Sequence, residues 1–317
     1  MSTLAATDAE YAALTMGCGL LDRSSRGKLA LTGPDAKQFL QGQVSNDVLA
    51  LTPGTGCYAA LLTPKGKMLA DLRVLDTGEE LLLDTERVTL QELFNVIRRF
   101  SLGHQVTLHK RTLERGLLSL LGPDAPRLAA AQTLGEAEHT HAEVEIDGVR
   151  AQAIRTDLGI DLLCEATQTA SLTEALVAAG ARPVSEDTAE ILRVERGRPR
   201  YGIDLDDSVI PQEAGLNERA VSFTKGCYVG QETVARLHYR GKPNRHLRGL
   251  RLAAAAPSGS EIRFGDRVVG HLGSVAESPS FGAVGLALIR REATPGSPVQ
   301  VGAAAVPATV VELPFTA

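Results

Sequence analysis

Residues 225–232 read Lys225-Gly226-Cys227-Tyr228-Val229-Gly230-Gln231-Glu232, and the sequence continues as Thr233-Val234-Ala235-Arg236. Two glycines here flank a thiol and a phenol, and an amide stands next to a carboxylate. This is a higher density of reactive and hydrogen-bonding groups than a structural turn requires. Glycine also permits close approach of the backbone to a ligand. We therefore expect this stretch to carry function.

The length and charge of the chain set its general class. At 317 residues it exceeds the usual size of a single core, so two or three domains are expected. The formal net charge of −5 argues against a protein built mainly to bind nucleic acid. No run approaches the ~18–20 apolar residues that span a bilayer, and the N-terminal residues lack the basic and apolar regions of a secretory signal. We expect a cytoplasmic protein without a membrane partner.

The cysteines stand far apart and form no CxxC pair: Cys18, Cys57, Cys164 and Cys227. Reduced thiols are therefore expected, and no metal site is expected from them. Lys225 and Arg236 lie near Cys227 in the sequence, which favours the nucleophilic thiolate, although free cysteine is more often buried and inert. The nearest histidines, His238 and His246, match the spacing of neither a cysteine–histidine nucleophile nor a zinc site.

Apolar periodicity predicts strands that alternate with single helices up to residue 197. The expected strands are 27–31, 54–62, 68–75, 81–83, 105–109, 116–121, 143–147, 149–155 and 160–164, and the expected helices are 36–42, 90–99, 124–133 and 170–179. A further helix between residues 185 and 197 has Asp187 and Glu190 in a capping-box-like arrangement at its start. This number of elements fits two split β-α-β domains of the ferredoxin-like kind.

The C-terminal part has a different pattern. Short apolar alternations occur at 247–252, 268–272, 284–289, 299–301 and 306–311, separated by Gly, Pro and Ser, which is typical of a small β-barrel or sandwich. Residues 241–244, Gly-Lys-Pro-Asn, are the expected linker.

Two groups of charged residues are candidates for ligand binding. Residues 225–248 hold six Lys or Arg against Glu232 alone, which suits the glutamate tail of a folate, an RNA backbone or a solvated face. Glu195, Asp204 and Glu213 are carboxylates that suit the paired donors of an aminopyrimidine such as a pterin, but salt bridges to neighbouring arginines would explain them equally well. No phosphate-binding GxGxxG or Walker motif is present.

In these residues the chain resembles a known family. The octapeptide at 225–232 looks like the signature of the YgfZ folate-binding proteins, which are relatives of the glycine-cleavage T-protein, an aminomethyltransferase. Supporting stretches are Leu31-Thr32-Gly33-Pro34-Asp35, Gln43-Val44-Ser45-Asn46-Asp47, Leu62-Thr63-Pro64-Lys65-Gly66, Arg193-Val194-Glu195-Arg196-Gly197, Tyr201-Gly202 and Pro211-Gln212-Glu213. The resemblance extends over nearly the whole chain and is least distinctive in the C-terminal part.

The resemblance implies an α+β fold of two interleaved ferredoxin-like domains over residues 1–246, followed by a β-barrel over residues 247–317. It also implies a tetrahydrofolate-binding accessory protein that supports the assembly or repair of iron–sulfur clusters, including those of tRNA-modifying enzymes. Iron–sulfur proteins or their assembly machinery would be its partners. RNA binding through the basic segment is a third hypothesis.

The same resemblance implies roles for particular residues. Cys227 would be the functional thiol. Tetrahydrofolate, or a one-carbon derivative, would be held by Glu195, Tyr201, Asp204, Gln212, Lys225, Tyr228, Gln231, Arg236 and Asn46. Aminomethyltransferases carry an acidic pair where this chain has Ala70-Asp71, so Asp71 would assist proton movement in an alternative function, that of a folate-dependent aminomethyl or methyl transferase or demethylase.

Overall fold

The structure is a computed structural model that describes residues 4–5 and 8–316. The chain divides into two units. Unit 1 comprises Met1–Tyr11, Ser185–Leu216 and Val234–Ala317, and unit 2 comprises Ala12–Val184 and Asn217–Thr233. Residues 1 and 317, the outer limits of the expected domains, lie outside the described residues. Within the described part of the chain, no helix has the length and apolar character needed to cross a membrane.

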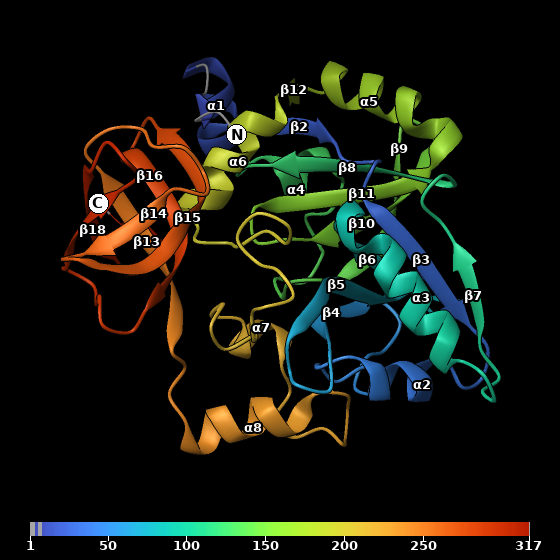
Figure 1. The fold of residues 1–317 in the computed structure, drawn as a ribbon. Coiled ribbons are helices and arrows are strands. Elements are labelled where there is room, and N and C mark those ends of the chain that lie inside the picture. Colours follow the sequence, from blue (N-terminus) through green and yellow to red (C-terminus); the bar gives the residue numbers. More distant parts are fainter. Residues whose placement is uncertain (1–3, 6–7, 317) are drawn as a thin grey trace. The chain divides into compact units, whose positions relative to one another are not determined.

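Unit 2 contains two sheets whose strands are interleaved along the chain (Figure 1). The five-stranded sheet has the order β4 (Thr55–Leu62), β5 (Met68–Asp76), β6 (Leu81–Thr85), β3 (Gly27–Thr32) and β7 (Thr107–Lys110). The six-stranded sheet has the order β12 (Arg182–Pro183), β2 (Gly19–Asp22), β8 (Arg115–Leu121), β11 (Gly159–Glu165), β10 (Val149–Arg155) and β9 (His141–Ile146). Strand β2 therefore joins a sheet whose other strands come after the whole five-stranded sheet.

Each of these sheets has one face covered by helices. On the five-stranded sheet these are α2 (Ala36–Gln43) and α3 (Leu90–Phe100), and on the six-stranded sheet they are α4 (Ala125–Leu128) and α5 (Thr169–Ala178). The short 3₁₀ turns η1 (Arg87–Thr89) and η2 (Ala166–Gln168) precede α3 and α5. The opposite faces of the two sheets meet, with Leu75 and Leu82 packed against Ile154. The unit is thus layered helix, sheet, sheet, helix.

Side-chain alternation along β5 decides what enters the layer between the sheets. Ala70, Leu72 and Val74 belong to the apolar cluster under α2 and α3. Because successive side chains of a strand point to opposite faces, Asp71 and Arg73 point away from that cluster. Charged groups are thereby carried into the interior of unit 2, next to Leu75.

Unit 1 is built around a six-stranded barrel. Its strands follow the order β15 (Arg267–Ser278), β14 (Glu261–Phe264), β17 (Pro298–Val301), β18 (Val306–Val311), β13 (Arg245–Leu252) and β16 (Gly282–Arg290), and the pairing of β16 with β15 closes the ring. Strand β1 (Leu4–Ala5) adds to β15 in parallel. Helix α6 (Glu186–Glu195) packs Ile191 and Val194 against the barrel.

Three further helices complete the described chain: α1 (Asp8–Met16), α7 (Asn217–Ala220) and α8 (Gln231–Arg240). The predicted fold class, two interleaved α+β parts and a C-terminal barrel, is confirmed. The linker expected at 241–244 separates α8 from β13. The helix that starts at Gln231, directly after the signature octapeptide's second glycine, was not predicted.

Two local predictions are wrong. The helix expected at 124–133 ends at Leu128, and Ala130 has a positive φ of 51°, which takes the chain out of the right-handed helical region. The cap of α6 is Ser185 rather than Asp187. The Ser185 hydroxyl accepts a hydrogen bond of 3.2 Å from the Thr188 amide, which is the usual way that a serine satisfies a free N–H at a helix start.

Candidate functional site

The signature segment, which we define as residues 217–230, lies along residues 41–46 in unit 2. The Ser222 amide donates to the Ser45 carbonyl at 3.0 Å, and the Val229 amide donates to the Gly42 carbonyl at 3.2 Å. The Ser45 hydroxyl donates in turn to the Ala220 carbonyl at 2.6 Å. The signature segment and residues 41–46, which are far apart in the sequence, are therefore joined by backbone hydrogen bonds.

The buried side chain of Lys225 also joins the signature segment to residues 41–46. Its side-chain Nζ donates to the carbonyls of Gln41 (2.6 Å), Val44 (2.7 Å) and Asn46 (2.8 Å), and the residue is 8% exposed. Burial lowers the pKa of Lys225 to about 8. These three bonds use every N–H of the ammonium. Lys225 therefore holds the segment, and the folate contact expected for it from the sequence stays a prediction.

Two glycines let a third stretch approach the signature segment. Gly230 has φ 85°, and a Cβ there would lie 2.6 Å from the Thr63 carbonyl oxygen. Gly66 has φ 75°, and its Cβ would lie 2.9 Å from Cβ of Thr233. Both positions need glycine, because a positive φ strains other residues and because a Cβ would come too close to the neighbouring atoms. The turn at 63–66 thus packs directly on the end of the signature segment and the start of α8.

Within this segment Cys227 and Tyr228 have opposite environments. Cys227 is exposed, whereas Cys18 and Cys164 are buried and Cys57 is half-buried. Burial raises the pKa of both Cys18 and Cys57 to about 12. Tyr228 is buried, its ring centroid lies 5.0 Å from Nζ of Lys225, and burial raises its pKa to about 12. Of the four cysteines, all of which the structure describes, Cys227 is the one whose thiol is open to reagents or partners.

The buried Asp71 forms a pair with the half-buried Tyr58. The Tyr58 hydroxyl donates to Oδ2 of Asp71 at 2.6 Å, and Asp71 is 7% exposed. Burial raises the pKa of Asp71, although the bond from Tyr58 works in the opposite direction. Burial and the neighbouring Asp71 also raise the pKa of Tyr58 well above its ordinary value. An acid with a raised pKa is suited to proton transfer near neutral pH.

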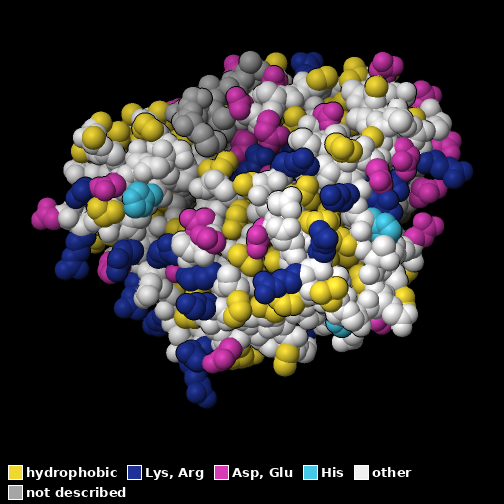
Figure 2. Space-filling model, turned by 45° about the vertical axis from the view of Figure 1, so that its right-hand side comes forward, with side chains coloured by type: hydrophobic (Ala, Val, Ile, Leu, Met, Phe, Trp, Pro, Cys, Tyr) yellow, Lys and Arg dark blue, Asp and Glu magenta, His cyan; other side chains and the backbone are white. Residues whose placement is uncertain are grey.

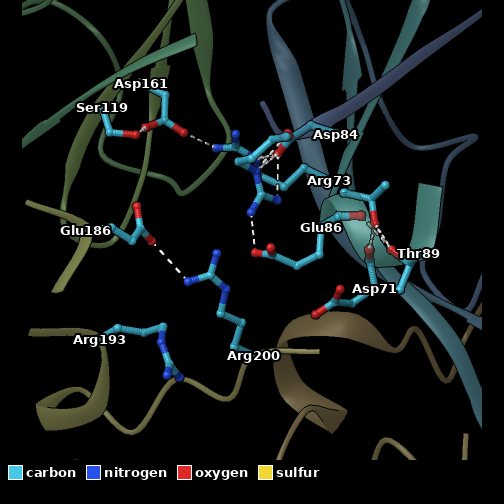
Figure 3. A network of polar contacts seen from close by, with 12 residues as sticks. Asp71, Arg73, Asp84, Glu86, Thr89, Ser119, Asp161, Glu186, Arg193 and Arg200 are labelled. Carbon is cyan, nitrogen blue, oxygen red and sulfur yellow. Dashed lines mark hydrogen bonds and ion pairs between the residues drawn. The ribbon is translucent and has the colours of Figure 1, made fainter. Parts of the chain in front are cut away.

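A network of buried ion pairs lies beside this pair (Figure 3). Arg73 binds Asp84 at 2.7 Å and Asp161 at 2.6 Å, so it joins the two sheets of unit 2. Arg26 binds Asp84 at 3.0 Å and also Glu86. Burial disfavours the Asp84 carboxylate, but the two guanidinium groups outweigh this effect and hold the pKa of Asp84 well below its ordinary value. The sequence patterns did not predict this network.

In unit 1, Glu195 has one carboxylate oxygen that is not used by the protein. Its Oε1 accepts a hydrogen bond of 2.9 Å from the Tyr11 hydroxyl and another from the Ser278 hydroxyl. Its Oε2 has no hydrogen-bond partner among residues 8–316, although Glu195 is only 6% exposed. A carboxylate oxygen that keeps a free lone-pair site in a largely buried residue suits recognition of a ligand N–H group.

Asp204 differs from Glu195 in this respect. Its Oδ1 accepts from the Ser274 amide at 2.8 Å, and its Oδ2 accepts from the Ser274 hydroxyl at 2.8 Å, the Arg200 amide at 2.9 Å and Arg193 at 3.1 Å. Four donors saturate a side chain that is completely buried. Asp204 therefore holds its loop onto the barrel strand β15, and the folate contact expected for it from the sequence stays a prediction.

Asn46 also has internal partners. Its amide nitrogen donates to the carbonyls of Tyr58 and Arg219, and its Oδ1 accepts from the Asp47 amide at 2.9 Å. Of the other predicted ligands, Tyr201 lies in the turn at Gly202 and Arg236 is exposed on α8. Gln231 begins α8 and is half-buried.

Gln212 is half-buried, and its Oε1 is buried without a hydrogen-bond partner among the described residues. Like Oε2 of Glu195, this oxygen can accept from a ligand.

A cavity of about 430 Å³ in unit 1 is lined by residues from 203–208 and from strands β15 and β16. Its lining includes Arg245, His271 and Arg290, and Asp204 is the one predicted site residue that it contains.

No group of three or more His, Cys, Asp or Glu side chains within the described part of the chain is arranged to hold a metal ion. On the face drawn in Figure 2, acidic side chains lie among the basic ones.

Comparison with known proteins identifies the family. Residues 2–225 match the GCVT N-terminal domain, and residues 245–316 match the glycine cleavage T-protein C-terminal barrel domain. The chain belongs to the glycine cleavage T-protein family. An aminomethyltransferase of Rubrobacter xylanophilus is 31% identical over 97% of this chain and 85% of its own length. One of Geobacillus kaustophilus is 30% identical over 96% of this chain and 89% of its own length.

Among solved structures, the aminomethyltransferase T of the glycine cleavage system from Bartonella henselae has the same fold. Its TM-score is 0.85 at 23% identity, covering 97% of this chain and 89% of that one. The predicted relation to T-proteins is confirmed, and tetrahydrofolate, the predicted cofactor, is the one that aminomethyltransferases of this family use. The narrower assignment to the YgfZ group stays a prediction, as do the roles of the individual site residues.

Proposed function

We propose that this protein is a folate-dependent transferase that moves an aminomethyl or methyl carbon between an amine donor and tetrahydrofolate. The observation that carries the proposal is the pair of the buried Asp71 and the half-buried Tyr58, in a chain with aminomethyltransferases among its relatives. Of the two folate-linked functions that the sequence suggests, the transferase accounts better for this pair, because an accessory protein that only binds folate has no use for a buried acid with a raised pKa.

Folate binding in this proposal rests on residues that still have free hydrogen-bonding groups. Glu195 offers Oε2 and Gln212 offers Oε1 to N–H groups of a pterin. Tyr201, Tyr228, Gln231 and Arg236 stay candidates for further contacts. When bound, tetrahydrofolate would supply the secondary amine to which the one-carbon unit is attached.

Asp71 would hold and move the proton. In its protonated form the carboxyl can donate to the nitrogen of the departing amine, which makes that nitrogen a better leaving group. The resulting carboxylate keeps the hydrogen bond from Tyr58, which favours the charged form. Ala70, which stands where the aminomethyltransferases have the first acid of a pair, is buried in the apolar cluster under α2 and α3. Asp71 therefore does this work alone.

Asp71→Asn is expected to slow transfer by roughly 10²–10⁴-fold, the usual contribution of a positioned general acid. Asparagine keeps an acceptor oxygen for Tyr58, but its amide N–H groups are not acidic and cannot transfer a proton. The rate would be followed as formation of methylene-tetrahydrofolate from tetrahydrofolate and aminomethyl donors, and as formation of methyl-tetrahydrofolate from tetrahydrofolate and methylamine donors. Asp76→Asn is the matched control, because Asp76 is a buried carboxylate of the same strand that pairs with Lys37 instead.

Calorimetric titration with tetrahydrofolate measures folate binding separately from the rate of one-carbon transfer. Asp71→Asn should bind as the wild type does, and Glu195→Gln should bind more weakly by about tenfold, because the carboxylate loses its charge-assisted bonds. If wild type forms no product from any donor, the transferase proposal fails. If wild type does not bind tetrahydrofolate at all, the transferase and the folate-binding accessory function both fail.

A second candidate function is favoured by Cys227. This thiol is exposed at the centre of the signature octapeptide, as a role in supporting iron–sulfur proteins, including tRNA-modifying ones, would require. The cytoplasmic location and a domain boundary at residues 246 and 247 belong to this hypothesis. The basic segment offers one cation fewer for binding an RNA backbone, because Lys225 donates to three backbone carbonyls.

Cys227→Ser tests this second candidate. In a strain that lacks the gene, this variant is expected to restore less than about a tenth of the activity of a cluster-dependent tRNA-modifying enzyme, since a serine hydroxyl is neither nucleophilic nor a soft ligand at neutral pH. The matched control is Cys57→Ser, at a half-buried thiol in the same unit. Full restoration by Cys227→Ser would remove the thiol from the function.

A further inference from the structure

Arg219, at the start of the signature segment, contacts Tyr58. It belongs to the short helix α7, and its guanidinium carbon lies 5.1 Å from the centroid of the Tyr58 ring. The same guanidinium donates through Nη2 to Glu138, which comes from the connection before β9. A planar cation on a ring face is an attractive contact that also restricts how the ring can turn. Tyr58 is thus held on its face by Arg219 and at its hydroxyl by Asp71.

The backbones of Arg219 and Tyr58 are joined as well. The amide nitrogen of Asn46 donates to the Tyr58 carbonyl at 2.8 Å and to the Arg219 carbonyl at 3.1 Å. One side chain therefore bridges β4 and the signature segment at the level of the ring contact. The predicted folate ligand Asn46 has here a clear positional role.

The guanidinium of Arg219 makes fewer hydrogen bonds than it could. Its Nε is buried and has no partner among the described residues. An unmade bond of this kind costs about 1–3 kcal/mol. Next to Arg219, the buried His139 also has an unpartnered ring nitrogen, Nδ1, and burial lowers its pKa to about 3. An arginine placed only for stability would be expected to satisfy its donors, whereas this one is oriented by the ring and by Glu138.

We propose that Arg219 is a positioning residue for the proton-transfer pair: supported by Glu138, it fixes the Tyr58 ring so that the hydroxyl stays on Asp71. The signature segment then serves the chemistry at Asp71 as well as any ligand that it contacts. The relevance for catalysis rests on the proposed transferase function. The positioning itself does not, because all its contacts lie within unit 2 and involve no folate.

The test is the titration of Asp71 by carboxyl ¹³C NMR in the folate-free protein labelled at aspartate. Asp71 is faced by Tyr58, Glu86 and Arg26, of which Tyr58 and Arg26 favour its charged form. Tyr58→Phe is expected to raise the pKa of Asp71 by about one unit, because the bond to the carboxylate is lost. Arg219→Met is expected to raise it in the same direction, by about half a unit. Arg115→Met, which removes an arginine paired with Glu165, is the control and should change nothing.

The double variant distinguishes positioning from simple charge removal. If Arg219 acts through Tyr58, adding Arg219→Met to Tyr58→Phe produces no further rise in the pKa of Asp71. An equal rise in both backgrounds would mean that Arg219 acts on Asp71 by its charge alone, and no rise in either would also overturn the proposal. Should Arg219→Met not fold, Glu138→Gln loosens the guanidinium instead and is expected to have the same sign. Because no folate is present, failure of this test is distinct from failure of the transferase proposal.

Discussion

Asp84→Asn should lower the free energy of unfolding of unit 2 by about 3–5 kcal/mol, the usual cost of removing one partner from a buried ion pair. Asp84 is 2% exposed and lies between Arg26 and Arg73, which bind it at 3.0 Å and 2.7 Å. Asparagine has nearly the same shape but leaves the two guanidinium groups with only Glu86 and Asp161. Urea unfolding followed by circular dichroism measures the loss.

The control for this prediction is Asp76→Asn in the neighbouring strand. Asp76 is also buried, but its partner Lys37 is 37% exposed and can turn towards water when the charge is lost. Its substitution should cost about 1 kcal/mol. Equal losses at Asp84 and Asp76 would contradict the view that Asp84 compensates two buried cations.

The pH dependence follows from the sign of the Asp84 shift. Its pKa in the folded protein lies below its value of 3.8 in the absence of a shift, so near and below pH 4 the unfolded chain binds a proton that the folded one does not. The contribution of Asp84 is therefore fully present well above pH 4 and is lost as the pH falls further. The difference in stability between wild type and Asp84→Asn should accordingly shrink below pH 4.

Lys225→Met should detach the signature segment, with a loss of about 3–5 kcal/mol. Methionine fills much of the same space but has no donor, so the carbonyls of Gln41, Val44 and Asn46 lose their partner. Each buried acceptor left unpaired costs about 1–3 kcal/mol. Hydrogen exchange should show faster exchange of the Ser222 and Val229 amides, which bond to the 41–46 stretch.

Lys65→Met is the control for Lys225, because Lys65 is exposed on the turn that packs near Gly230. It should change the unfolding free energy by less than about 0.5 kcal/mol. If Lys225→Met were equally mild and the exchange of both amides unchanged, the three carbonyl bonds would not be what holds the segment.

The elements of the fold were largely predictable because their signals are local. Alternation of apolar and polar residues predicts strands such as β5 and β8. The positions of Gly and Pro predict the turns that flank them. The length of α4 was overestimated because the apolar pattern of the sequence continues past Ala130. The helix ends at Leu128, and the positive φ of Ala130 prevents it from continuing. Helix α8 was not predicted because its apolar pattern is weak: Val234 is its one buried residue.

The site was predictable in its residue types but not in its hydrogen-bond partners. Asp204 has the chemistry of a pterin ligand, yet it is satisfied by Ser274, seventy positions later in the sequence. Glu195 has the same chemistry and keeps a free oxygen. Nothing in either residue's neighbourhood along the chain distinguishes the two. Only long-range contacts decide which carboxylate is available.

A signal for the buried network was present in the sequence. In Ala70-Asp71-Leu72-Arg73-Val74 the charged residues alternate strictly with apolar ones, which is usually taken as a strand with one face in water. In this fold the polar face is covered by a second sheet that carries Asp161 and Ser119, whose hydroxyl donates to Asp161 at 2.6 Å. Alternation alone does not tell whether the polar face meets solvent or a complementary sheet.

The interleaving of the two sheets has a consequence for how the chain reaches this structure during synthesis. Strands β3 to β7 are continuous in the chain, so the five-stranded sheet has all its strands once Lys110 has left the ribosome. Strand β2 emerges earlier but must wait for its partner, since Leu20 pairs with Leu120. Nascent chains whose residues up to 112 have emerged from the ribosome, while β8 has not, should therefore already resist protease over 27–110. Strand β2 should still be cut, and during this interval an apolar strand edge is open to chaperones.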